Sequence, residues 1–145
     1  MLTLLTNITA RKELHVMKVL DEYFHYYDLA KDDETSKERL ISLFSEEIEF
    51  VLNGDRKQGM NSWKGFLNMF YEGTFEMKHM YEGWKPVSED PGTYETKWAV
   101  CGKKATGEVY TLTGVDKARL DTKGKIVYLE NIPDTANAFD KYKSI

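Results

Sequence analysis

Residues 109–131 read VYTLTGVDKARLDTKGKIVYLEN and are the most informative segment for the fold class. Alternate side chains differ in character over its first twelve residues, which predicts a long β-strand with two unlike faces. One face carries a mainly apolar set: Tyr110, Leu112, Gly114, Asp116, Ala118 and Leu120. The other face carries Thr111, Thr113, Val115, Lys117 and Arg119. Residues 121–124 read as a turn, so residues 125–131 are predicted to form the next strand of a hairpin.

Two earlier segments alternate in the same way and extend the predicted sheet toward the N-terminus. In residues 75–81 the set expected to face inward is Phe75, Met77, His79 and Tyr81. In residues 94–101 one face carries Tyr94, Thr96, Trp98 and Val100. Turn residues separate these segments, so we expect neighbouring strands to be antiparallel.

The first half of the chain is predicted to be mainly helical. Apolar residues at helical spacing indicate helices around residues 16–27, 35–44 and 63–70. A short strand, residues 48–52, and a polar loop, residues 54–59, separate the second helix from the third. Helices followed by antiparallel strands, without repeats or linkers, predict one α+β domain over residues 1–145, with helices on one face of a curved sheet. The terminal tails are expected to be peripheral.

Composition excludes several classes of function. The net charge is −4 and the basic residues form no stripe, which argues against nucleic-acid binding. Cys101 is the single cysteine, so no intrachain disulfide forms, as is typical of cytoplasmic proteins. The sequence contains no 18-residue apolar run that could span a membrane. Three separated histidines give no metal-binding spacing, so we expect no metal and no other cofactor.

Asp116 is the most informative candidate for chemistry. It belongs to the apolar set of its strand, and a buried carboxyl must be hydrogen-bonded, paired with a charge or protonated. No Lys or Arg shares that set, so we expect burial to raise the pKa of Asp116. One interpretation is a structural acid bonded to its neighbours, and the other is a functional acid. Two interpretations are also open for His79: it is a packing residue or a proton-transfer group.

Several short motifs, in this order, resemble the nuclear transport factor two (NTF2) or SnoaL-like superfamily. They are a Tyr-rich first helix ending at Asp28, Leu43-Phe44 before a Glu-rich strand, Gly59 before the third helix, and Val115-Asp116 followed by residues 123–126, KGKI. The resemblance covers about residues 13–134. It implies a cone-shaped fold whose curved antiparallel sheet and three helices enclose a pocket. Members include isomerases, dehydratases, cyclases and non-catalytic binding or dimerisation modules, so the fold leaves the function open.

Two catalytic branches of the superfamily match this chain in part. Aligned with ketosteroid isomerases, Asp116 and Tyr23 take the positions of the acid and the tyrosine of the oxyanion hole, but Leu52 replaces the general base. A neutral carboxylic acid that donates a hydrogen bond to an oxyanion is an established use of such a site. Leu52 argues against the complete isomerase chemistry.

The second branch is the scytalone dehydratases. Tyr27, Asp28 and His79 resemble their tyrosine, their orienting aspartate and their histidine. Phe50 and Tyr110 depart from that pattern, because a tyrosine and a second histidine are expected there. The resemblance therefore implies acid–base chemistry with half of the dehydratase set in place.

The remaining candidates are predicted to form the wall of the pocket. They are Phe50, Leu52, Trp63, Tyr81, Trp98, Tyr110, Leu112, Leu129 and Asn131. Aromatic rings at this density suit a small, largely apolar and cyclic ligand. We therefore predict an acid–base dehydratase, isomerase or cyclase, and the alternative is a non-catalytic ligand-binding or dimerisation module. The less charged outer face of the sheet, with Thr111, Thr113 and Val115, predicts a homodimer.

Overall fold

The computed structural model describes residues 2–144, and side chains from residue 10 onward. Its helices are α1 (Leu2–Leu29), α2 (Glu34–Ser42), α3 (Met60–Glu72) and a short 3-10 helix (Asp140–Tyr142). Its strands are β1 (Phe44–Leu52), β2 (Asp55–Gln58), β3 (Thr74–Tyr81), β4 (Lys85–Pro86), β5 (Tyr94–Lys104), β6 (Val109–Leu120) and β7 (Ile126–Pro133). The order of elements is that of the predicted α+β domain.

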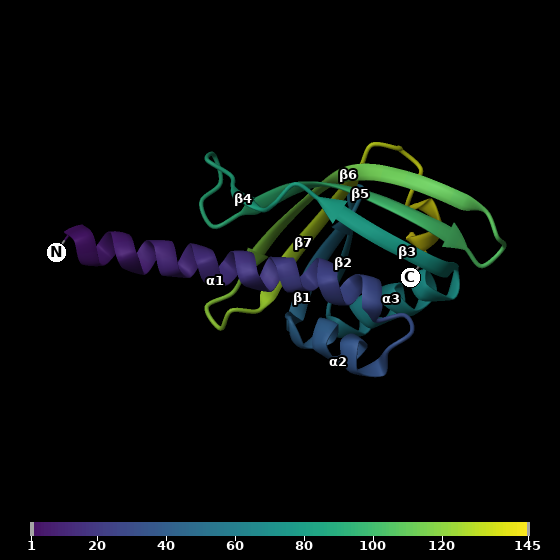
Figure 1. Ribbon diagram of the computed structural model, residues 1–145, viewed down its shortest axis with the longest axis horizontal. Helices are drawn as coiled ribbons and strands as arrows, with labels where there is room; N and C mark the ends of the chain where they lie inside the picture. The colour runs from purple at the N-terminus through teal and green to yellow at the C-terminus, as the bar shows by residue number, and fades with distance from the viewer. Residues whose placement is uncertain (1, 145) are drawn as a thin grey trace.

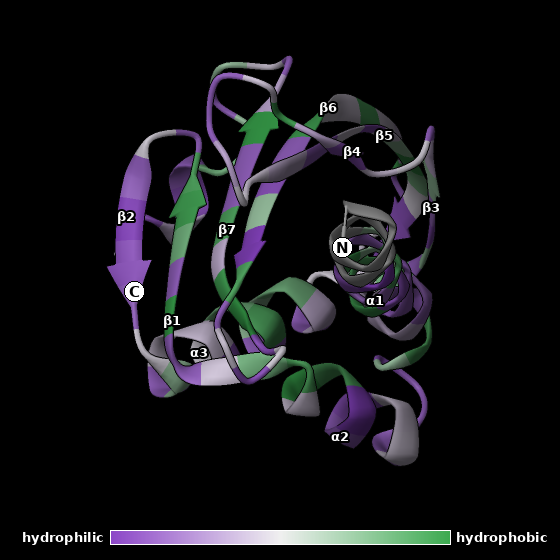
Figure 2. Ribbon diagram, turned by 90° about the vertical axis from the view of Figure 1, so that its left-hand side faces the viewer, coloured by the Kyte–Doolittle hydropathy of each residue, from purple (hydrophilic) through white to green (hydrophobic). Residues whose placement is uncertain are grey.

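The described strands form one seven-stranded sheet in the order β2-β1-β7-β6-β5-β3, with β4 beside β5. The sheet curves around the helices, which lie on its concave side, and β1 to β7 do not close into a barrel (Figure 2). The sheet is mixed, because β1 runs parallel to β7, whereas the sequence predicted an antiparallel sheet. A parallel pair needs a long crossover connection, and here residues 53–125 provide it. Strand alternation alone does not reveal such a pairing.

The core lies between the helices and the concave face of the sheet. The predicted stripe of α1 is buried through Leu20, Tyr23, Phe24 and Tyr27. Helix α3 contributes Trp63, Phe66 and Leu67, and the sheet contributes Phe50, Ala118, Ile126 and Leu129. Helix α1 begins well before the predicted residue 16, and its N-terminal half extends away from the body of the domain (Figure 1).

Three local expectations are wrong, each for a physical reason. The polar loop at residues 55–58 is strand β2, because it pairs with β1 as an antiparallel hairpin. Phe75 is 58% exposed instead of inward, because the β3 register shifts between Thr74 and Glu76. The C-terminal tail is not peripheral: Phe139 and Tyr142 are buried, and the Tyr142 ring packs edge-on against Phe66 at 4.9 Å.

Substitution of two large aromatic residues tests which of them belong to the core. Trp63 is 1% exposed, so Trp63→Ala should lower the free energy of unfolding by about 3–5 kcal/mol. Phe75→Ala, at the exposed bulge, should change it by no more than about 0.5 kcal/mol. Urea unfolding of both variants and the parent measures the difference. Equal losses would mean that Phe75 faces the core.

Candidate functional site

A small cavity of about 50 Å³ lies on the concave face of the sheet, against α1 and α3. Of the predicted site residues, those that line it are Tyr23, Tyr27, Phe50, Leu52, Trp63, His79, Trp98, Tyr110, Leu112, Asp116, Leu129 and Asn131. Asp28 and Tyr81 do not line it. The residues missed by the sequence reasoning are Val51, Phe66, Phe70, Val100 and Phe139. The predicted apolar stripe of α3 that holds Trp63 also holds Phe66 and Phe70, and the predicted set of β5 that holds Trp98 also holds Val100, whereas no sequence signal pointed to Phe139.

Asp116 is the most buried ionisable group of the cavity wall. It lies in the middle of β6, is 1% exposed and pairs with Thr96 on β5 and Asn131 on β7. Burial raises the pKa of Asp116 to about 8, and the neighbouring Trp98 indole lowers it to a smaller extent. The expected direction of the shift is confirmed. At neutral pH this carboxyl is therefore mainly protonated and can donate a hydrogen bond.

A phenol close to Asp116 provides a second donor. Burial raises the pKa of Tyr23 well above its ordinary value, and the negative charge of Asp116 raises it further. Tyr23 comes from α1, so the helix and the sheet each contribute one protonated oxygen to the cavity. The expectation that Asp116 faces the interior near Tyr23 agrees with this electrostatic coupling.

His79 and Asp28 form a bonded pair across two elements. Asp28, in the last turn of α1, approaches His79 of edge strand β3 with 2.6 Å between its Oδ1 and the histidine Nδ1. The backbone N–H of His79 also donates to Asp28 Oδ2 at 2.7 Å. Asp28 therefore fixes both the strand and the imidazole ring from outside the cavity. Because Nδ1 is occupied, Nε2 remains for another partner.

Aromatic rings hold the imidazole on its other sides. The His79 ring packs against Tyr27 at 5.3 Å, Phe24 at 5.4 Å and Trp98 at 6.2 Å between centroids. Tyr81 is placed differently from the prediction. Its ring stacks on Phe24 and its hydroxyl donates to Asp21 at 2.8 Å, outside the cavity.

The histidines and carboxylates of the described residues form no metal site. No cluster of three or more His, Cys, Asp or Glu side chains among these residues is placed to hold a metal ion. The histidines lie apart, with His15 beside Gly124, His25 exposed on α1 and His79 on β3. None of the described helices is long and apolar enough to cross a membrane.

Comparison with known proteins identifies the family. No protein-family model and no curated protein matches the chain. Among solved structures, an NTF2-like protein of unknown function from Exiguobacterium sp. 255-15 is 51% identical, over 80% of this chain and 98% of that one, with a TM-score of 0.77. The chain belongs to the NTF2-like family.

More distant structures share the NTF2-like fold. The epoxide hydrolase/cyclase-like enzyme SalBIII, of pyran ring formation in the polyether salinomycin, is 16% identical over 85% of this chain and 93% of that one, with a TM-score of 0.71. RV0760c from Mycobacterium tuberculosis, in complex with estradiol-17β-hemisuccinate, is 12% identical over 81% and 92%, with a TM-score of 0.67. These two matches show a common fold. The NTF2-like membership that the sequence motifs predicted is confirmed by the 51% identical structure.

Replacing Asp116 with Asn tests the burial of this acid. The unfolded chain releases the proton near the free-Asp value of about 3.9, whereas the native protein holds it until about pH 8. Between these values the native state binds more protons, so the free energy of unfolding of the parent falls as pH rises. Asn does not ionise. The free energy of unfolding of the variant should therefore rise relative to that of the parent by on the order of 1 kcal/mol per pH unit over this window.

Urea unfolding between about pH 5 and pH 8 measures the difference in free energy of unfolding between Asp116→Asn and the parent. The control is Asp32→Asn, because the Asp32 side chain is 79% exposed, and its difference from the parent should be nearly independent of pH. NMR titration of the Asp116 carboxyl gives the direct answer. A native pKa below about 3.9 would show that Asp116 is a structural acceptor and remove its role as a neutral acid.

Proposed function

We propose that this NTF2-like protein is a cofactor-independent acid–base enzyme for a small, largely apolar cyclic carbonyl or hydroxyl compound. The reaction class is dehydration, isomerisation or ring closure. The observation that carries the proposal is the placement of the oriented His79 and the protonated Asp116 on one aromatic cavity. A base and a neutral acid with different environments are what proton transfer next to a carbonyl requires.

Each group has a defined task in this proposal. His79, held by Asp28 through Nδ1, takes a proton from the carbon beside the carbonyl with its Nε2. Asp116 and Tyr23 donate hydrogen bonds to the oxygen as it gains negative charge. His79 then returns the proton, either to another carbon, which is isomerisation, or to a leaving hydroxyl, which departs as water. Both routes leave the protein in its starting protonation state.

The cavity must enlarge before such a ligand can bind. At about 50 Å³ it has room for a few water molecules, whereas a cavity of about 150 Å³ is known to hold benzene. Its wall offers one route, because Phe70, Tyr110, Leu112 and Phe139 also line a surface groove beside the C-terminal segment. We place the entrance at Phe139.

The entrance is tested by the access of a small solute to the buried indoles. Phe139→Ala should increase acrylamide quenching of tryptophan fluorescence several-fold, because Trp63 and Trp98 line the cavity that the substitution opens. Phe75→Ala should leave quenching unchanged. Circular dichroism confirms that both variants are folded, and unchanged quenching in folded Phe139→Ala would exclude this route.

Catalysis is tested by exchange of α-protons of small cyclic ketones in D₂O, followed by NMR. The parent should accelerate exchange, and His79→Gln should lower the rate by about 10²–10⁴-fold. His25→Gln, at an exposed position on α1, is the matched control and should keep the parent rate. Ligand binding without exchange across a ketone series would favour the alternative, a non-catalytic binding module.

We further propose that the protein forms a homodimer through the outer face of the sheet. On this face Thr111 and Thr113 are exposed, and Met80 on β3 is 54% exposed. Light scattering at micromolar concentration should give twice the chain mass, and Thr111→Arg should reduce it because a charge at an apolar interface is unfavourable. Glu38→Arg on α2, away from the sheet, is the control. A monomeric parent would contradict the proposal.

A further inference from the structure

Four polar atoms of the cavity wall make no hydrogen bond of good geometry within the described part of the chain, although the Trp98 indole is a weak donor toward Asp116 and lowers its pKa. They are Trp63 Nε1, Trp98 Nε1, Asp116 Oδ1 and Asn131 Oδ1. Trp63, Trp98 and Asp116 are each at least 95% buried as residues. Leaving a buried polar atom unpaired costs free energy, so several at one cavity point to a polar partner that they bind in common.

Three of these side chains are held side by side by neighbouring strands. Asp116 on β6 lies directly opposite Asn131 on β7. Trp98 on β5 lies opposite Gly114, and a Cβ at residue 114 would come within 2.6 Å of the indole Cζ2. Glycine at this position therefore lets the indole lie flat on β6, beside Asp116. We call Trp98, Asp116 and Asn131 the polar end of the cavity.

Trp63 reaches the cavity from α3. Its ring packs against Phe44 at 4.6 Å and against Phe50 at 5.2 Å, which fixes its orientation. Phe50 is paired with Leu129 on β7, two residues before Asn131. The helix thus adds a second indole to the lining that the three strands provide.

The hydrogen-bonding capacities of these groups specify the chemistry of the ligand. Both indoles are donors only, the Asn131 oxygen is an acceptor only, and a protonated carboxyl both donates and accepts. A ligand that offers only a carbonyl would leave the Asn131 oxygen unpaired. A ligand that offers both a carbonyl oxygen and a hydroxyl group satisfies both kinds of site.

We propose that the polar end binds a hydroxy ketone. Its carbonyl oxygen receives hydrogen bonds from Asp116 and the Trp98 indole, and its hydroxyl donates to Asn131 Oδ1. This inference rests on the proposed function and narrows its substrate class. It also separates recognition from chemistry: Asn131 and Trp98 select the ligand, whereas His79 moves the proton.

A matched ligand series tests the proposal: 2-hydroxycyclohexanone, cyclohexanone and methylcyclohexane. Binding to the full chain is measured by titration with ¹⁵N–¹H spectra of the tryptophan indoles. The parent should bind the hydroxy ketone about tenfold more tightly than the ketone, as expected for one added hydrogen bond. The indole signals of Trp63 and Trp98 should shift, whereas that of Trp84, outside the cavity, should not.

Variants assign the preference to particular atoms. Asn131→Leu should bind both ketones equally, whereas Asn131→Asp retains an acceptor and should keep the preference even if the Leu variant fails to fold. Trp98→Phe should weaken binding of both ketones about tenfold, and Trp84→Phe, the control, should change neither. A preference that survives in Asn131→Leu would overturn the assignment.

The outcomes also separate this inference from the proposed function. If the parent binds all three probes equally, the cavity is a binding site but the polar end does not select hydroxy ketones. If none of the probes binds to the parent or to Phe139→Ala, the cavity is not a site for small cyclic ligands, and the proposed function itself is wrong.

Discussion

The parallel pairing of β1 with β7 is the constraint on which the cavity depends. It joins the first strand of the chain to the last one, so that Phe50 and Leu52 lie beside Leu129 and Asn131. Without this pairing the β5–β6–β7 hairpins would form an open meander with no neighbour on the β7 side. With it, the sheet bends around α1 and α3 (Figure 2). Side chains far apart in sequence then line one small cavity.

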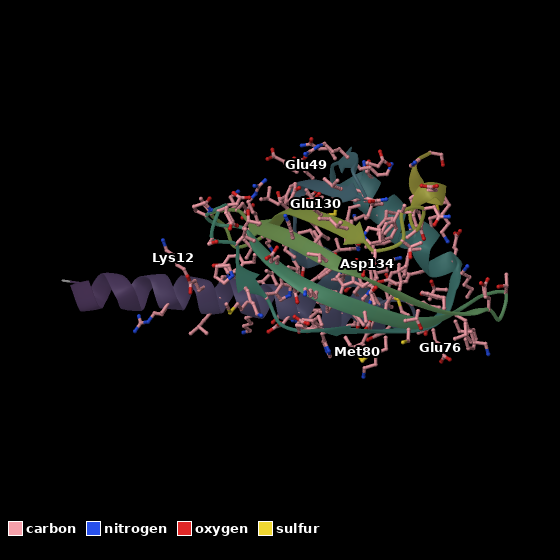
Figure 3. The ribbon with its side chains drawn as sticks, turned by 90° about the horizontal axis from the view of Figure 1, so that it is seen from above. Lys12, Glu49, Glu76, Met80, Glu130 and Asp134 are labelled. Atoms are coloured by element: carbon pink, nitrogen blue, oxygen red, sulfur yellow. The ribbon has the colours of Figure 1, made fainter. Side chains whose placement is uncertain are left out.

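The interior combines tight aromatic packing with polar groups that weaken the fold. In Figure 3, which draws the described side chains, the labelled charged residues Glu49 and Glu76 lie toward the outer edge of the molecule. Asp116 differs from them, because it is buried in the middle of the sheet with its pKa raised. A hydrophobic residue there would stabilise the protein more, since a raised carboxyl pKa opposes folding at neutral pH. Such a cost is expected at functional sites, where stability and activity compete.

Membership of the NTF2-like family accounts for the fold, whereas the chemistry depends on the residues that line the cavity. The resemblance to two catalytic branches predicted a base, a tyrosine and a histidine at positions that Leu52, Phe50 and Tyr110 occupy. The His79–Asp28 pair and Asp116 are therefore the groups left to carry proton transfer in the proposed reaction. The same fold can accommodate different reactions because the cone requires only the packing pattern, whereas the reaction requires particular atoms.

Which residues face inward could be predicted from the amino-acid sequence wherever a strand keeps a strict period of two. Asp116 on β6, Trp98 on β5 and His79 on β3 all lie on the predicted face, because alternate side chains of a strand must point to opposite sides. The burial of Asp116 and the direction of its pKa shift followed from that alternation alone.

Features that depend on contacts between distant segments could be read only from the folded structure. The β1–β7 pairing, the burial of Phe139 and Tyr142, and the removal of Tyr81 from the cavity are of this kind. The bulge that exposes Phe75 is another such feature. One extra residue in a strand moves the neighbouring side chain to the opposite face of the sheet, and nothing in the composition indicates it. The His79–Asp28 bond spans 51 residues, and only the docking of α1 along the edge of β3 brings its atoms to 2.6 Å. Local patterns predict the face of a helix or strand on which a side chain lies. Which side chains of distant elements come into contact depends on how the whole chain packs.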